Sequence, residues 1–126
     1  MGESHEMLLG REVAAWRALG QLARRQGQAI LTQQADRVAG LRVEMRAQLR
    51  LALLAQDEAR PVRQALPEAE RREREAELRQ AQLAARDAVR LTLEVSRTSC
   101  EALSRAGSPA LIGPRVVGVV PTYRAA

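Results

Sequence analysis

The sequence predicts an all-α protein: an elongated antiparallel helical hairpin or coiled-coil bundle, followed by a flexible apolar C-terminal tail. Apolar residues recur at three- and four-residue steps over most of the chain, which is the period of an amphipathic helix. The 126 residues include one Trp, one Tyr and no Phe, a composition that suits a narrow Leu/Ala/Val seam better than a compact core. Prolines interrupt the helical pattern at residues 61–67 and again from residue 109.

The first helical stretch is expected over residues 5–57, with Ser4 as its N-cap. Residues 32–40 contain cap-forming residues and a glycine, which weakens a helix by about 1 kcal/mol relative to alanine. Two interpretations stay open, one long kinked helix or two helices that meet near residue 34, and we favour a nearly continuous pair. The apolar stripe of this stretch consists of Leu9, Val13, Trp16, Leu19, Ala23, Ile30, Val38, Leu41, Met45, Leu49 and Ala52.

A loop is predicted over residues 58–66, and a second long helix over residues 67–106. Pro61 marks the loop, and Pro67 suits the first position of a helix, where its missing N–H has no cost. Each long helix carries a single apolar stripe, so the two must bury these stripes against each other in one domain over residues 1–107. The second stripe consists of Leu78, Ala81, Ala85, Val89, Leu93, Ser96, Cys100 and Leu103.

Two glycines, Gly20 and Gly27, lie one heptad apart in the first helical stretch. They are either tolerated flaws in a helix that packing holds together, or positions that let a neighbouring helix approach closely. The sequence leaves both interpretations open.

The tail, residues 108–126, has an unusual composition, with three prolines, two arginines and no acid. Burying its seven large apolar side chains would stabilise it by about 14 kcal/mol in all. Ordering its residues costs roughly 1–2 kcal/mol each, which is more. We therefore predict a flexible segment that attaches loosely to the bundle, orders on a partner, or adds a strand in a dimer.

The sequence offers no catalytic, cofactor-binding or metal-binding residues. All 20 basic residues are arginine, which excludes a P-loop lysine and Schiff-base chemistry. The single histidine, His5, and the single cysteine, Cys100, are too far apart in the chain to start a zinc cluster. We therefore predict that the protein is not an enzyme and needs no cofactor.

Charge and targeting signals indicate a cytoplasmic protein without a membrane span. The net charge of +5 is spread along the chain, whereas a nucleic-acid binder normally clusters its basic residues, so no nucleic-acid partner is expected. The N-terminal stretch "MGESHEMLLG" lacks the features of a signal peptide. A lone cysteine fits a reducing compartment.

The helical layout resembles that of the FlgN-type flagellar export chaperones. The matching stretches are "LLGREVAAWRALGQLARRQGQAILTQQADRVAGLRVEMRAQL" and "REAELRQAQLAARDAVRLTLEVSRTSCEAL". The resemblance implies a non-enzymatic cytoplasmic chaperone that binds the helical termini of hook-associated (hook–filament junction) proteins and delivers them to the flagellar type III export apparatus. It places partner binding at Val89, Leu93, Leu103, Leu111, Ile112, Val116 and Val117.

Two other classes of function remain open. A structural coiled coil, as a scaffold or a FliJ-like export stalk, would have a long rigid hairpin with a fully satisfied seam, and its tail would be dispensable. An arginine-rich nucleic-acid binder would show affinity that falls steeply with salt. The seam contains no polar residue that specifies an oligomeric state, so a homodimer is also open.

Overall fold

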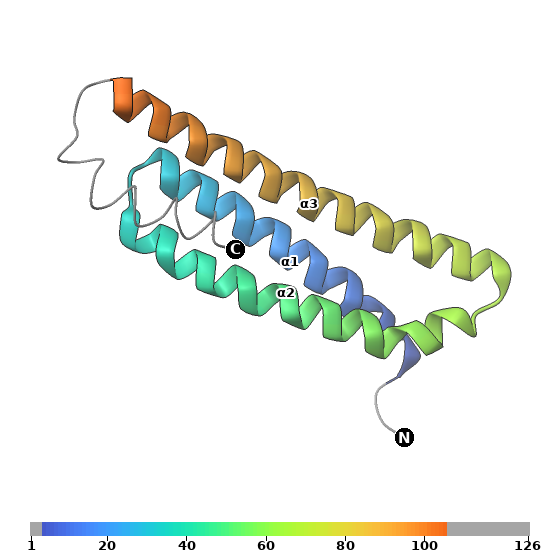
Figure 1. Ribbon diagram of the computed structural model, residues 1–126. Coiled ribbons are helices and arrows are strands. Elements are labelled where there is room, and N and C mark those ends of the chain that lie inside the picture. The colour runs from blue at the N-terminus through green and yellow to red at the C-terminus, as the bar shows by residue number, and fades with distance from the viewer. Residues whose placement is uncertain (1–3, 106–126) are drawn as a thin grey trace.

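The computed structural model describes residues 4–105 and places three α-helices side by side (Figure 1). The helices are α1 (His5–Leu31), α2 (Ala35–Gln64) and α3 (Glu68–Arg105). They run up, down and up, with α1 between the other two. The all-α prediction is confirmed, and so is the Ser4 N-cap, whose hydroxyl accepts a hydrogen bond from the Met7 N–H at 3.2 Å. Gly107 and the predicted tail lie outside the described residues.

Two helices meet near residue 34, but the favoured nearly continuous course of this pair is wrong, because the chain reverses after Leu31 and α2 packs back along α1. Gln33 adopts a left-handed backbone conformation, with φ of 56°. Its N–H donates to the Ile30 carbonyl at 3.1 Å, and the Gln34 N–H donates to the Ala29 carbonyl at 2.9 Å. This pair of bonds satisfies the last carbonyls of α1 and ends the helix abruptly. The described residues therefore form three helices, and not the two-helix hairpin that the sequence predicted.

We expect Gln33→Gly to stabilise the protein by about 0.5–1 kcal/mol. Glycine relieves the roughly 1–2 kcal/mol cost of a left-handed L-residue, and loses about half of that gain to its greater freedom in the unfolded chain. Urea denaturation measures the change. The matched control is Gln28→Gly, at an exposed position inside α1, which should destabilise by about 0.5–1 kcal/mol. A loss of stability in Gln33→Gly would contradict the assigned turn.

The loop between the last two helices covers residues 65–67, so the predicted loop over residues 58–66 is wrong. α2 continues through Pro61, which is exposed, to Gln64. Proline removes one helical hydrogen bond, but the turns around it are held against α1. Ala59 is fully buried there, and the Arg63 side chain is 9% exposed. Tertiary contacts therefore override the local helix-breaking signal.

α1 and α3 pack closely through small residues. A Cβ added at Gly20 would lie 3.4 Å from the Ala85 Cα, and one added at Gly27 would lie 3.3 Å from the Thr92 hydroxyl. That hydroxyl lies 2.6 Å from the carbonyl oxygen of Ala23, which it can reach only because no larger side chain intervenes. Of the two interpretations of Gly20 and Gly27, the structure supports the close approach of a neighbouring helix.

We expect Gly20→Leu to cost roughly 1–3 kcal/mol of stability, because the new side chain must push α3 away from α1. Gly10 is the matched control, since a Cβ there meets nothing within 4 Å. Gly10→Leu should stabilise by about 0.5–1 kcal/mol through helix propensity alone. Thermal unfolding of the two variants gives the comparison, and equal effects would show that the contact at Gly20 is not tight.

A buried ion pair joins the start of α1 to the end of α2. Arg63 Nη1 lies 2.6 and 2.5 Å from the two Glu12 carboxylate oxygens, and the Glu12 side chain is 1% exposed. Burial raises the pKa of the Glu12 carboxyl, although the hydrogen bond and positive charge of Arg63 oppose this shift. Neither group can lose its partner without leaving an uncompensated polar group in the interior.

We expect Arg63→Met to cost about 3–5 kcal/mol at neutral pH, because Glu12 then loses its buried counter-charge. Without Arg63, folded Glu12 holds its proton to higher pH than unfolded Glu12. Its contribution to stability is therefore complete below the ordinary pKa of 4.5 and is lost as the pH rises. Urea denaturation should show a larger loss at pH 7 than at pH 4.

The control is the double variant Glu12→Leu/Arg63→Met, which removes both charges. It should recover most of the stability at pH 7. If the single variant loses the same stability at both pH values, the ionisation of Glu12 is not the cause.

Candidate functional site

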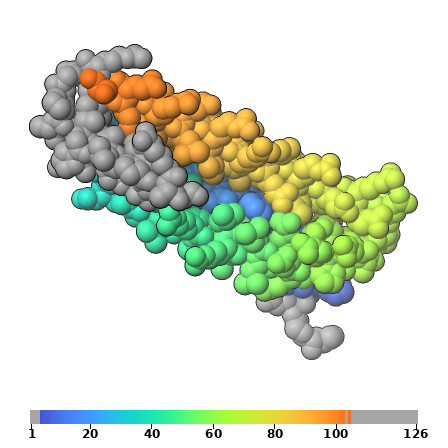
Figure 2. Space-filling model, viewed as in Figure 1, coloured from blue at the N-terminus to red at the C-terminus, as the bar shows by residue number. Residues whose placement is uncertain are grey.

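An open groove runs between α2 and α3, with α1 as its floor. α1 packs along both neighbours, whereas α2 and α3 make few contacts with each other. Figure 2 shows atoms of α1 (blue) at the bottom of this groove, between α2 (green) and α3 (yellow to orange). The groove has a volume of about 390 Å³. It is lined by Trp16, Leu19, Gln26, Arg42, Met45, Arg46, Leu49, Gln82, Ala85, Arg86, Val89, Thr92 and Leu93.

The walls of the groove carry apolar side chains that the protein leaves uncovered. Leu49 on α2 is 40% exposed and Leu93 on α3 is 45% exposed. Met45 and Val89 lie beside them and are half-buried. The α3 wall extends from Gln82 to Leu93, which is about 16 Å or three helical turns. The groove therefore matches the apolar face of a short helix.

The rim of the groove is positively charged. Arg46 on α2 and Arg86 on α3 are exposed and stand on opposite walls. Neither forms an ion pair with any residue between 4 and 105. Arg42 adds a third guanidinium to the lining, which contains no carboxylate among the described residues. Acidic side chains would be attracted to both edges of the groove.

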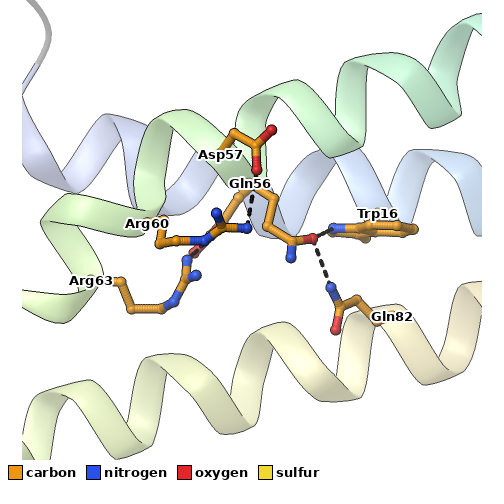
Figure 3. A network of polar contacts seen from close by, with 7 residues as sticks. Trp16, Gln56, Asp57, Arg60, Arg63 and Gln82 are labelled. Carbon is orange, nitrogen blue, oxygen red and sulfur yellow. Dashed lines mark hydrogen bonds and ion pairs between the residues drawn. The ribbon is translucent and has the colours of Figure 1, made fainter.

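A polar cluster links all three helices at one end of the groove (Figure 3). The side-chain oxygen of Gln56, on α2, accepts hydrogen bonds from Trp16 Nε1 at 3.1 Å and from Gln82 Nε2 at 2.8 Å. This oxygen joins α1 and α3 to α2, so the groove is tied at the end nearest the α2–α3 loop. On the next turn of α2, Arg60 pairs with Asp57 at 3.1 Å.

The predicted partner-binding residues are placed as follows. Val89 and Leu93 lie together in the α3 wall of the groove. Leu103 lies in the last part of α3, and its side chain is not among those described. The remaining four positions, Leu111, Ile112, Val116 and Val117, lie outside the described residues.

Sequence reasoning missed the opposite wall and the rim of the groove. Met45 and Leu49 belong to the predicted apolar stripe, but the stripe does not say which of its members a neighbour covers. Arg46 and Arg86 have no sequence signal that separates them from the other arginines. Their position on facing walls follows from the path of α2 back along α1.

No group of three or more His, Cys, Asp and Glu side chains within residues 4–105 is placed to hold a metal ion. Cys100 is half-buried, and its burial, with a smaller effect from the charge of Glu101, raises the pKa of the thiol. This shift keeps the thiol protonated and poorly nucleophilic.

No protein-family model, curated protein or solved structure matches the chain. No helix within residues 4–105 combines the length and apolar character needed to cross a membrane.

Proposed function

We propose that this protein is a non-enzymatic cytoplasmic chaperone that holds an amphipathic helix of its protein cargo in the groove between α2 and α3. The observation that carries this proposal is the groove itself, which is apolar, open and about three helical turns long. Lining of this kind is typical of helix-in-groove recognition.

The helix arrangement supports the proposal. In a four-helix bundle each helix packs against two neighbours. α1 already has two, whereas α2 and α3 each have one extensive neighbour. A cargo helix in the groove would give both of them a second neighbour and complete the bundle. It would also cover Leu49 and Leu93, at roughly 1 kcal/mol each for the nearly half of the side chain that is now uncovered, and the smaller exposed part of Val89.

The charges of the groove define the cargo helix. With Arg46 and Arg86 on opposite walls, it should carry acidic residues on both sides of its apolar face. The C-terminal segment of this chain, residues 108–126, is a poorer occupant because it has two arginines and no acid. An acidic amphipathic helix of another protein is therefore the occupant that we propose.

The resemblance to the FlgN-type chaperones suggests which class of protein carries this cargo helix. On that basis the cargo is a hook–filament junction protein, bound through a helical terminus and kept unassembled until it reaches the flagellar type III export apparatus. A scaffold or FliJ-like stalk would instead have no use for an uncovered groove with a charged rim.

The natural fluorescence of Trp16 provides the test, because it is the single tryptophan of the chain and it lines the groove. Purified full-length protein is titrated with the helical terminal segments of hook–filament junction proteins encoded in the same genome. Segments without tryptophan are used, so that the signal comes from Trp16 in the groove. We expect saturable binding, with Leu93→Glu and Arg86→Glu each weakening the affinity about tenfold or more.

Two matched controls lie on the same helix outside the groove. Leu91→Glu changes a leucine that is 60% exposed, and Arg90→Glu changes an exposed arginine one turn after Arg86. Both should bind the segments as the unchanged protein does. Binding that survives Leu93→Glu and Arg86→Glu would exclude the groove, and no binding of any junction-protein segment would exclude the flagellar cargo.

A further inference from the structure

We propose that the cargo helix places a carboxamide side chain, asparagine or glutamine, against the polar cluster at the end of the groove, and that this contact fixes the register of the helix. The inference rests on the proposed function, because it requires a helix in the groove. Trp16 of α1, Gln56 of α2 and Gln82 of α3 form a polar layer, to which each helix contributes one side chain. A cargo helix would be the fourth helix of the bundle and would supply the fourth member of this layer.

The indole of Trp16 determines the orientation of both glutamine amides. An indole N–H can only donate, so the Gln56 atom that lies 3.1 Å from Trp16 Nε1 is the amide oxygen. The same oxygen lies 2.8 Å from the Gln82 amide, which must therefore present its nitrogen to it. Two groups of the layer are not used in these bonds, the amide nitrogen of Gln56 and the amide oxygen of Gln82 (Figure 3).

These two amide groups are available to a partner. Within residues 4–105, neither Gln56 Nε2 nor Gln82 Oε1 forms a hydrogen bond. Both side chains are half-buried, but neither atom is sealed from solvent. Gln82 lines the groove, whose floor is α1, so a helix that lies over α2 and α3 would cover the layer. Such a helix must provide hydrogen-bond partners, because covering both groups without them is unfavourable.

A carboxamide is the side chain that matches both groups. The Gln56 nitrogen needs an acceptor and the Gln82 oxygen needs a donor, and asparagine and glutamine carry both on one planar group. A carboxylate only accepts, and lysine or arginine only donates. Serine and threonine do both through one oxygen close to their own backbone, so the longer carboxamide is better suited to helices whose axes are roughly 8–10 Å apart. A leucine would leave both amide groups buried without a partner.

The spacing between the polar layer and the apolar walls defines the register. Leu49 lies seven residues before Gln56 on α2, and Val89 lies seven residues after Gln82 on α3. Because α2 and α3 run in opposite directions, both steps lead the same way along the groove, by about 10 Å. The cargo helix should therefore carry its carboxamide one heptad from the apolar residue that meets Leu49 and Val89. A single polar contact of this kind fixes the register of coiled coils, because a shifted helix places an apolar side chain on it.

Two synthetic helices test the proposal with the full-length protein. Each probe has about three heptads, with leucine and alanine on one face, glutamate along both edges of that face, and a fluorescent label at one end. The probes differ at one position of the apolar face, one heptad from the central leucine. This position is glutamine in the first probe and leucine in the second. Fluorescence anisotropy measures the affinity of each probe, and circular dichroism verifies that each protein variant is folded.

We expect the unchanged protein to bind the glutamine probe about tenfold more tightly than the leucine probe, because the glutamine alone satisfies both amide groups. The variant Gln56→Leu/Gln82→Leu should reverse this preference, since its layer is apolar. General damage to the fold would weaken both probes, whereas a reversal requires that the probe contacts the layer. The matched control Gln64→Leu/Gln80→Leu replaces exposed glutamines of the same two helices and should keep the original preference.

The outcomes separate this inference from the proposed function. Leu93→Glu, in the wall of the groove, should weaken both probes about tenfold or more. Equal affinity of the two probes, or the same preference in Gln56→Leu/Gln82→Leu, would overturn the polar layer as the register contact and leave the cargo groove intact. If neither probe binds, or if Leu93→Glu has no effect, the cargo groove itself is excluded and this inference fails with it.

Discussion

Close packing on two sides of α1 is the constraint on which the rest of this structure depends. Towards α3, Gly20, Ala23 and Gly27 let the two backbones approach until the Thr92 hydroxyl bonds to a carbonyl of α1. Towards α2, alanines make up much of the contact, with Ala52 and Ala59 fully buried, and Val38 and Leu41 are buried near the α1–α2 turn. Small residues allow this close approach because their side chains do not hold the two helix backbones apart. Since α1 occupies the space between its neighbours, α2 and α3 diverge and leave the groove open.

Buried polar groups fix how the helices are aligned. Glu12 and Arg63 pair across α1 and α2 at one end, and the Gln26 amide donates to the Val38 carbonyl at 3.3 Å near the other end. Between them, Gln56 joins all three helices. A seam of alanines can slide without much change in energy, whereas each of these polar groups loses its partner if a helix shifts. The polar contacts therefore supply the register that the small apolar core does not.

α2 carries uncovered apolar residues on two of its faces. Leu49 faces the groove, where Leu93 of α3 stands opposite it between arginines of both walls, whereas Leu51 and Leu54 border a second hollow on the side of α2 that faces α1. A groove whose edges carry arginine and no carboxylate among the described residues is complementary to an acidic helix.

The sequence by itself determined the helical class, the Ser4 cap, the helix after Pro67, and the apolar stripes that contain Val89 and Leu93. These features depend on local helix propensity and on apolar periodicity, and both can be read from the sequence without knowledge of the fold. The reversal at Gln33 and the helix through Pro61 were decided by tertiary structure, because packing against α1 compensates for a left-handed glutamine and for a proline inside a helix. The groove also required the fold. Periodicity identifies apolar residues, but which of them stay uncovered depends on where the neighbouring helices run.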